Sequence, residues 1–407
     1  MIDRDRQWRS LMEMAEIGAT PAGGVCRLAL TDEDKQSRDL FVKWAEEAGC
    51  EVRVDRVGNI FARRAGTDPD AAPVVTGSHL DSQPLGGKFD GPYGVLAGLE
   101  VVRALNDAGT ETRAPIDIVC WTDEEGCRFT SKTMGSMVFA GLLSEAQVRA
   151  VPDPDGKTFG DELERIGYAG AEPVGGTPVK AYFENHIEQG PVLEQAGVPV
   201  GAVVGAQGQR CFLVTVTGEE GHAGTVPMVQ RKDSFLGAAR MTDAVNRAAF
   251  QFDPVPVATV AHVRVRPNSR NTIPGETVFT IDSRHRDADV LAALEEVMLG
   301  DIRKIADDMG LGVDIQQTSL AAPVAFDENC VAAVRRAAAD SGIACMDVFS
   351  GAGHDACKIA SIAPSGMIFV PCEKGISHNE AENATPDDLA AGTRVLMGAI
   401  LEAANTP

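Results

Sequence analysis

The sequence predicts an α/β fold: a layered domain with a mostly parallel sheet, into which an α+β domain is inserted. Its 407 residues are about twice the length of an ordinary domain, which favours two domains. Helix and strand patterns alternate towards both ends of the chain, as in a parallel sheet covered by helices. In the middle the order becomes β-α-β-β-α-β, which is typical of a ferredoxin-like unit with an antiparallel sheet and helices on one face.

The first alternating region begins with a helix over residues 32–48. Thr31, with Asp34 three positions later, gives this helix an N-terminal capping pattern. A second, apolar helix is expected over Gly94–Asn106. The strand Ile116–Thr122 shows no polar alternation, which indicates a strand buried on both faces. The other strands expected here are Glu51–Val54, Ile60–Arg63, Pro73–Thr76 and Val179–Phe183.

The middle region supplies the elements of the inserted domain. They are, in chain order, strand Arg210–Thr217, helix Arg231–Ala249, strands Val257–Val265 and Thr277–Arg284, helix Val290–Met309 and strand Val313–Leu320. The alternating pattern then resumes with helix Glu328–Asp340, strands Met346–Phe349 and Met367–Pro371, and a last helix that begins at Pro386, a residue that suits a first turn. We therefore expect a discontinuous domain of residues 1–207 plus 325–407 and an inserted domain of residues 208–324.

Charge and composition exclude several classes of protein. Hydrophobic residues make up 44% of the chain and charged residues 24%, as in soluble globular proteins. The 37 Lys and Arg residues against 59 Asp and Glu residues give a net charge of −22, which argues against nucleic-acid partners and anionic membranes. No apolar run approaches the ~20 residues that span a bilayer.

The N-terminus and the cysteines predict a cytoplasmic protein. The segment from Met1 to Arg6 is charged and lacks the apolar core of a signal peptide. The nine cysteines are scattered and form no CxxC pair, which is typical of buried, reduced thiols. Their spacing does not indicate a cysteine-based zinc site.

Histidines and carboxylates follow the ends of several expected strands. In open α/β sheets the carboxyl edge is where ligands bind, so these side chains are expected to meet there. Taken singly, each has an ordinary explanation, since a loop histidine is usually just hydrogen-bonded and an acidic pair is usually solvated. Together they form a ligand set for zinc, manganese, cobalt or nickel. The residues are His79, Asp90, Glu124, Glu125, His186 and His378.

These segments belong to a longer series of motifs that covers essentially the whole chain. With them the sequence resembles the hydantoinase/carbamoylase group of dinuclear metal amidohydrolases, within the aminoacylase and carboxypeptidase G superfamily. The motifs are Gly77–Ser82, Gly87–Gly91, Asp123–Phe129, His186–Pro191, His222–Met228, Ser269–Asn271, Ser350–Ala356 and Ser377–Glu380. The resemblance implies a catalytic discontinuous domain and an inserted domain for dimerisation and closure over the substrate.

The resemblance also implies roles at two divalent metal ions. His79, Asp90 and His186 would hold one ion, and Asp90, Glu125 and His378 the other, with Asp90 bridging because a carboxylate has two oxygens. Glu124 would be the general base that takes a proton from water and passes it to the departing nitrogen. A cis peptide bond is expected after Asp90.

Further residues are implied to bind a small anionic ureido or amide substrate. His222 would stabilise the oxyanion and Arg284 would bind the substrate carboxylate. The case for Arg284 has independent support, because a protein of charge −22 needs a local cation to hold an anion; the alternative is an ordinary surface ion pair. Gln209 and Asn271 match polar contacts of the family, and Gly353 lies in a loop expected to close over the substrate.

The implied activity is the hydrolysis of N-carbamoyl-L-amino acids to amino acid, ammonia and carbon dioxide. Allantoate amidohydrolase and β-ureidopropionase carry almost the same motifs and remain alternatives. An aminoacylase or dipeptidase-like exopeptidase is more distant, since those enzymes usually place an acidic residue where this chain has His186. The last alternative is a non-catalytic relative that has kept the fold but not the activity. In this family the inserted domain forms a homodimer, and some of its polar residues can reach the partner's active site.

Overall fold

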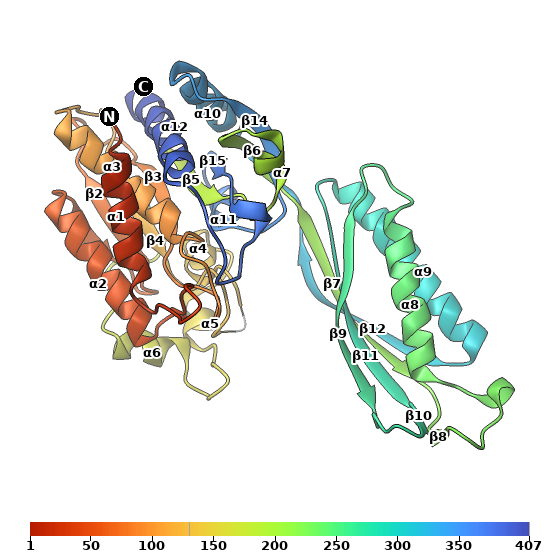
Figure 1. The fold of residues 1–407 in the computed structure, drawn as a ribbon. Coiled ribbons are helices and arrows are strands. Elements are labelled where there is room, and N and C mark those ends of the chain that lie inside the picture. The colour runs from red at the N-terminus through yellow and green to blue at the C-terminus, as the bar shows by residue number, and fades with distance from the viewer. Residues whose placement is uncertain (130, 407) are drawn as a thin grey trace. The chain divides into compact units, whose positions relative to one another are not determined.

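The computed structural model describes residues 1–129 and 131–406, and the chain divides into two compact units (Figure 1). The discontinuous unit comprises Met1–Val204 with Ala325–Pro407, and the inserted unit comprises Gly205–Val324. The first boundary between them lies three residues before the expected one and falls within β6 (Val200–Ala206), a strand that continues past the sheet of the discontinuous unit towards the inserted unit. In the described ranges, no helix has the length and apolar character needed to cross a membrane.

The discontinuous unit is built on a mixed sheet with the strand order β1-β2-β4-β3-β5-β15-β6-β13, and β14 pairs with β6. The strands β4, β3, β5 and β15 are parallel neighbours, whereas β2 and β6 are antiparallel to the strands they flank. The mostly parallel sheet predicted from the sequence is therefore confirmed. The remaining strand bounds are β1 Glu51–Val54, β2 Ile60–Arg64, β3 Val74–His79, β4 Ile116–Trp121, β5 Ala181–Ile187, β13 Val324–Ala325, β14 Cys345–Ser350 and β15 Ser365–Val370.

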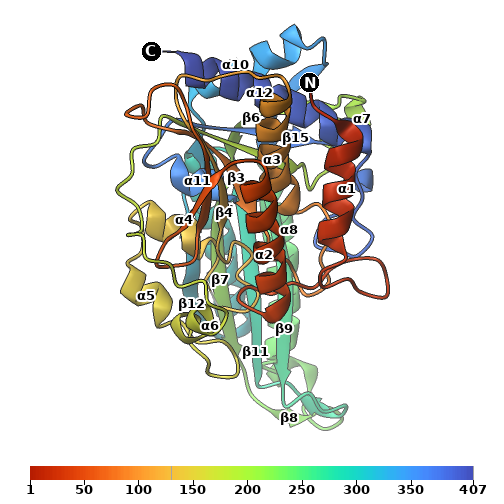
Figure 2. The same ribbon diagram turned by 90° about the vertical axis from the view of Figure 1, so that its left-hand side faces the viewer.

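Helices pack against the strands that carry the candidate ligands. α3 (Pro92–Asp107) contacts β3, α12 (Pro386–Asn405) contacts β15, and α1 (Arg4–Ala15) lies beside both helices (Figure 2). On β5 and β15, α11 (Asp355–Ile359) is a further neighbour. The other helices are α2 Asp32–Glu47, α4 Met134–Phe139, α5 Glu145–Arg149, α6 Phe159–Arg165, α7 Val192–Ala196, α10 Glu328–Asp340 and the short 3₁₀ turn Glu373–Gly375.

The helix starts follow the capping patterns of the sequence. The Thr31 hydroxyl accepts the Asp34 backbone N–H at 3.3 Å, as the pattern predicts, and the Asp34 carboxylate accepts the Leu30 N–H at 2.8 Å. Thr385 caps the last helix in the same manner, by accepting the Asp388 N–H at 3.1 Å, with Pro386 in the first turn.

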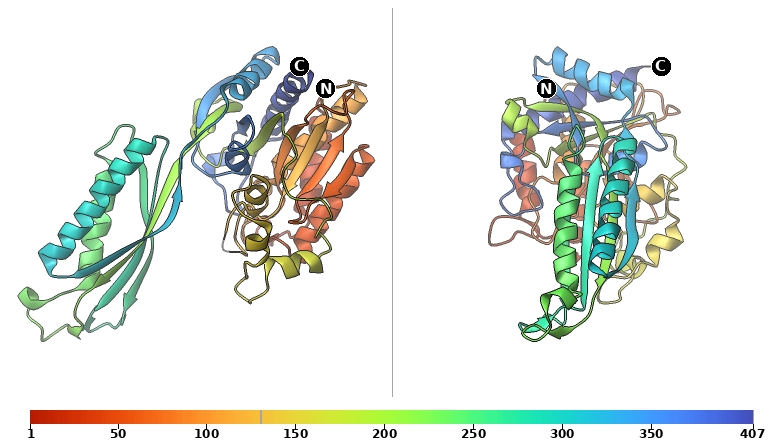
Figure 3. Two further views of the ribbon diagram at one scale, coloured as in Figure 1. Left: turned by 180° about the vertical axis from the view of Figure 1, so that it is seen from behind. Right: turned by 90° about the vertical axis from the view of Figure 1, so that its right-hand side faces the viewer.

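The inserted unit has the predicted ferredoxin-like arrangement. Its sheet has the order β12-β7-β11-β9 with antiparallel neighbours, and α8 and α9 lie side by side on one face (Figure 3). A small ribbon of β8 and β10 extends one end. The bounds are β7 Gly208–Thr217, β8 Gly221–His222, α8 Ser234–Ala249, β9 Val257–Arg266, β10 Thr272–Ile273, β11 Glu276–His285, α9 Ala288–Met309 and β12 Gly312–Ala321, with a 3₁₀ turn at Met228–Gln230.

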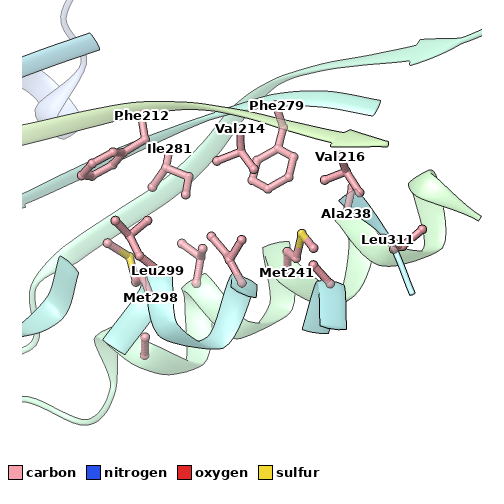
Figure 4. Close-up of a cluster of buried hydrophobic side chains, with 14 of the residues drawn as sticks. Phe212, Val214, Val216, Ala238, Met241, Phe279, Ile281, Met298, Leu299 and Leu311 are labelled. Atoms are coloured by element: carbon pink, nitrogen blue, oxygen red, sulfur yellow. The ribbon is translucent and has the colours of Figure 1, made fainter. Parts of the chain in front are cut away.

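The inserted unit encloses a hydrophobic core of its own. Alternate residues of β7, Phe212, Val214 and Val216, face the two helices, as the period of two in a strand requires (Figure 4). Met241 of α8 and Met298 of α9 pack against them from the helical layer. The burial of these side chains stabilises the inserted unit, and this contribution does not depend on contacts within the discontinuous unit.

Candidate metal centre

The carboxyl ends of four neighbouring parallel strands bring the candidate ligands together. His79 is the last residue of β3, and His186 is the penultimate residue of β5. Glu124 and Glu125 follow β4, and His378 lies in the loop after β15. Because parallel strands end at one edge of a sheet, residues far apart in the sequence meet at that edge.

The Asp90 carboxylate lies between two groups of side chains. Its Oδ1 is 3.2 Å from His186 Nε2 and 3.8 Å from His79 Nε2. Its Oδ2 is 3.4 Å from His378 Nε2, which in turn is 3.6 Å from Glu125 Oε2. Within each group, His79–Asp90–His186 and Asp90–Glu125–His378, the ligand atoms lie within 4.8 Å of one another, so each group could hold a metal ion.

The histidine rings are oriented as metal ligands are. The Nδ1 of His79 is 2.9 Å from the Asp81 carbonyl oxygen, and the Nδ1 of His186 is 2.9 Å from the Ile187 carbonyl oxygen. A carbonyl only accepts, so each Nδ1 carries a hydrogen, and each Nε2 is the atom that can bind a metal ion once it holds no proton. Glu125 Oε1 is buried without a hydrogen-bond partner. This set of nitrogen and oxygen donors fits a divalent transition-metal ion.

A second carboxylate, Asp81, fixes the two glutamates. It accepts the backbone N–H of Glu124 at 3.2 Å and that of Glu125 at 3.1 Å. Asp123, just before them, has a φ of 57°, an uncommon conformation for a residue other than glycine, and it turns the chain sharply after β4. Gln83 donates to Glu125 Oε2 at 2.6 Å. The side chains of the two adjacent glutamates face different histidines, Glu124 towards His79 and Glu125 towards His378.

Buried negative charge dominates the electrostatics of the site. Burial and the charge of Glu125 raise the pKa of Glu124 well above its usual range, and burial and the charge of Asp90 do the same for Glu125. Burial also acts to raise the pKa of Asp90, but the hydrogen bond and charge of His186 outweigh it and hold that pKa below its usual range. Positive charge placed among these carboxylates would stabilise their ionised forms.

The cis peptide bond expected after Asp90 is absent. In the described chain, cis peptides occur at Asp253–Pro254 and Arg266–Pro267. Gly91 makes the turn into α3 instead, with a φ of 86° that favours glycine. A Cβ at this position would lie 2.4 Å from the His79 ring, so the turn also requires the absence of a side chain.

Two of the candidate substrate contacts form a pair on the inserted sheet. Gln209 of β7 and Arg284 of β11 are direct neighbours in the strand register. Both bind Asp282: Arg284 Nε and Nη2 each lie 3.0 Å from one of its carboxylate oxygens, and Gln209 Nε2 donates to it at 2.7 Å. Arg284 thus makes the two-pronged contact with which arginine binds a carboxylate, and this contact is also the ion pair expected as the alternative to substrate binding.

Two more candidates, His222 and Asn271, form a second pair at the β8–β10 ribbon. The Asn271 carbonyl accepts the Ala223 N–H at 2.9 Å. His222 Nδ1 accepts the Gly224 N–H at 3.0 Å, so in the neutral ring Nε2 carries the hydrogen and is a donor. The structure does not bring the two pairs together, because β7 runs from Gln209 to Thr217 between them, about 26 Å at ~3.3 Å per residue.

Gly353 lies in the loop between β14 and α11, next to a histidine that the motifs left without a role. A Cβ at Gly353 would meet no atom within 4 Å, so packing does not require glycine there. The neighbouring His354 is buried, its ring centroid is 4.5 Å from that of His186, and its Nε2 is 2.9 Å from Ser350 Oγ. His354 therefore supports the His186 ring from the side.

Sequence reasoning missed several residues that support the ligands. Asp81, Gln83, Gln189, Ser377 and Glu382 each contact a candidate ligand or its backbone. Asp81 could have been suspected from its place two residues after His79. The others act through hydrogen bonds that leave no spacing signal in a single sequence.

Comparison with known proteins agrees with this site. The family model described as "Peptidase family M20/M25/M40" matches residues 75–402 of this chain. An N-carbamoyl-L-amino-acid amidohydrolase of Rhizobium meliloti is 47% identical over 99% of this chain and 97% of its own length. The allantoate amidohydrolase of Escherichia coli is 37% identical over 94% of both chains. A hydantoinase/carbamoylase family amidase from Burkholderia multivorans is 56% identical, with a TM-score of 0.96 over 100% of this chain and 99% of that one. The likeness extends through both units, and the chain therefore belongs to peptidase family M20/M25/M40, in the hydantoinase/carbamoylase group of amidohydrolases.

Proposed function

We propose that this protein hydrolyses the carbamoyl C–N bond of N-carbamoyl-L-amino acids and releases amino acid, ammonia and carbon dioxide. The observation that carries the proposal is the position of Asp90, whose two oxygens face two separate groups of nitrogen and oxygen ligands. The name carried by the Rhizobium meliloti relative, over nearly the full length of both chains, supports the choice of substrate.

His79, Asp90 and His186 would hold one divalent ion, and Asp90, Glu125 and His378 a second. Zinc, manganese, cobalt and nickel all suit such a mixture of imidazole and carboxylate. Ions bound there would acidify a water molecule and polarise the carbamoyl carbonyl group.

Glu124 would act as the general base and then as the general acid. Its backbone is held by Asp81, and its Oε2 lies 3.8 Å from His79 Nε2, at the edge of the first ligand group. Burial and the charge of Glu125 raise its pKa, so its carboxyl group is suited to hold a proton between two steps. It would take that proton from water and give it to the departing nitrogen.

Arg284 and Gln209 would bind the substrate carboxylate. In the structure this pair holds the carboxylate of Asp282 with three hydrogen bonds, which indicates the kind of anion that it fits. Gly353 would contribute backbone contacts from its loop, where the lack of a side chain allows a close approach.

His222 and Asn271 would serve the substrate bound by a partner subunit in a homodimer formed through the inserted unit. The length of β7 that separates this pair from Gln209 and Arg284 is several times that of a small ureido acid, so one substrate cannot touch both pairs of a single inserted unit. The Nε2 hydrogen of His222 would stabilise the negative charge on the carbamoyl oxygen.

The proposed setting is the cytoplasm, with neither nucleic acid nor a membrane as a partner. The nine cysteines are all free thiols, which suits a reducing compartment. The net charge of −22 opposes binding to phosphate-rich surfaces.

An ammonia-release screen of the metal-loaded protein tests the proposal. The substrates are N-carbamoyl-α-amino acids of both hands, N-carbamoyl-β-alanine, allantoate and N-acetyl amino acids, the last with detection of free amine. We expect the highest kcat/KM for an N-carbamoyl-L-α-amino acid. Preference for allantoate or N-carbamoyl-β-alanine would move the assignment to those enzymes, and preference for acetyl compounds would move it to an aminoacylase. No turnover at all with bound metal would indicate a non-catalytic relative.

A further inference from the structure

We propose that Glu382 is a positioning residue that sets the orientation of Asp90 and connects it to the loop of His378. The inference rests on the two-ion site proposed above. Glu382 lies beyond the motifs used to identify the site, and only 4% of its surface is exposed. A carboxylate buried so completely needs hydrogen-bond donors around it, and the donors that surround Glu382 belong to the loops that carry candidate metal ligands.

One oxygen of Glu382 holds the backbone at Asp90. Oε1 accepts the N–H of Phe89 at 3.0 Å and the N–H of Asp90 at 3.1 Å. These two N–H groups lie at the turn into α3, immediately before Gly91. Because both donate to one oxygen, the turn cannot rotate without losing both hydrogen bonds.

The other oxygen of Glu382 is connected to the Asp90 side chain through the hydroxyl group of Ser377. Oε2 lies 3.0 Å from Ser377 Oγ, and that hydroxyl lies 3.1 Å from Asp90 Oδ2. Gln189 Nε2 closes the ring, at 2.9 Å from the same Oδ2 and 3.0 Å from Ser377 Oγ. Ser377 directly precedes His378, so this ring links two of the candidate ligands that would hold the second ion.

The backbone at Gly87 lies close to the carboxyl group of Glu382. A Cβ on Gly87 would lie 2.0 Å from the Glu382 carboxyl carbon and Oε1. A side chain at position 87 would therefore displace the carboxyl group from its present position. Hydrogen bonds on two sides and backbone on a third fix the carboxylate relative to Asp90.

This arrangement predicts that Glu382 controls metal affinity more than it controls folding. Partners of metal ligands typically change metal affinity by about 10–100-fold when removed, because the ligand loses its preferred orientation. We expect Glu382→Ala to weaken binding of the ion shared by Asp90, Glu125 and His378 by about this factor. Glu382→Gln keeps an acceptor for the two backbone N–H groups and should recover most of the affinity.

Asp55 provides a matched control. It is also a buried carboxylate that accepts two backbone N–H groups, those of Val57 and Asn59, each at 3.0 Å, but it lies in the turn between β1 and β2. Asp55→Ala should lower the melting temperature and leave metal affinity unchanged. A merely structural role for Glu382 would give the same result for both variants.

The experiment measures zinc and manganese content after dialysis, the affinity of each ion by titration, and the melting temperature of the metal-free proteins. Wild-type affinity for both ions in folded Glu382→Ala would overturn the inference and leave the proposed function intact. A wild-type protein that binds no metal would overturn the proposed function itself. Should Glu382→Ala fail to fold, Ser377→Ala cuts the same ring at a half-buried loop position, and its binding of both ions at wild-type affinity would likewise overturn the inference.

Discussion

The Nε2 of His186 lies 3.2 Å from Asp90 Oδ1, and this contact determines the protonation of the metal-free site. Burial lowers the pKa of His186, but the hydrogen bond and charge of Asp90 outweigh it and raise that pKa to about 9. The neighbouring His79, in contrast, has its pKa lowered to about 4, mainly by burial. At neutral pH and without metal, His186 is therefore in its charged, doubly protonated form and His79 is neutral.

Metal binding should consequently release at least one proton. A metal ion and a proton compete for His186 Nε2, so apparent affinity should rise about tenfold per pH unit as pH increases towards 9, the folded-state pKa, and level off above it. Titration calorimetry at pH 7 in two buffers of different ionisation enthalpy measures the released protons. An observed enthalpy that is the same in both buffers would contradict this protonation state.

Replacing Glu124 should separate chemistry from metal binding. Glu124→Gln keeps the size of the side chain but cannot take up a proton, so kcat should fall by about 10²–10⁴-fold while metal content stays at the wild-type level. Glu125→Gln is the matched variant one residue away, and it should lose metal instead. Near wild-type turnover in metal-loaded Glu124→Gln would refute the role of this residue.

Arg284→Lys should weaken substrate binding. Lysine lacks the flat, two-pronged donor group that Arg284 uses on Asp282, so KM should rise by roughly 10–100-fold with a smaller change in kcat. Arg264→Lys, at an exposed position of β9 in the same sheet, is the control and should leave KM unchanged. Equal KM values for the two variants would show that Arg284 does not bind the substrate carboxylate.

Mixing two inactive variants tests the assignment of His222 to the partner's site. Glu124→Gln and His222→Ala should each be inactive alone. In a mixed dimer one site would combine an intact Glu124 with an intact His222 from the other subunit, so random mixing should restore about a quarter of wild-type activity. If His222 acts within its own chain, no mixed dimer contains a complete site and activity stays at the background level.

The elements that carry the ligands could be predicted because they are short buried strands with clear ends. Ile116–Trp121 is apolar enough to be recognised as a buried strand, and the polar residues directly after it mark the end of that strand. The sequence does not predict β6, because its glycine and alanine residues have little preference for strands and its place is set by the distant strand β15. α1 was missed because charged residues crowd its short apolar face.

The convergence of the candidate ligands could be predicted from the sequence, whereas the residues that support them could not. His79, His186 and His378 converge because they lie at or after the carboxyl ends of parallel strands, and the alternation of strands and helices in the sequence predicts such a parallel sheet. The role of Glu382 could not be predicted, because it accepts hydrogen bonds from backbone N–H groups, which almost every residue has whatever its side chain. The cis bond after Asp90 was wrongly expected because the freedom of Gly91 makes it unnecessary.

The strands β6 and β13 are neighbours in the sheet of the discontinuous unit. The chain thus departs from that sheet and returns to it at adjacent points, so the whole insertion occupies the place of an ordinary connection between two strands. A short turn could join the same two strands, and the chain without the insertion would still contain every candidate ion ligand. Changes in the length or composition of the inserted unit can therefore leave the strands that carry the candidate ion ligands unaltered.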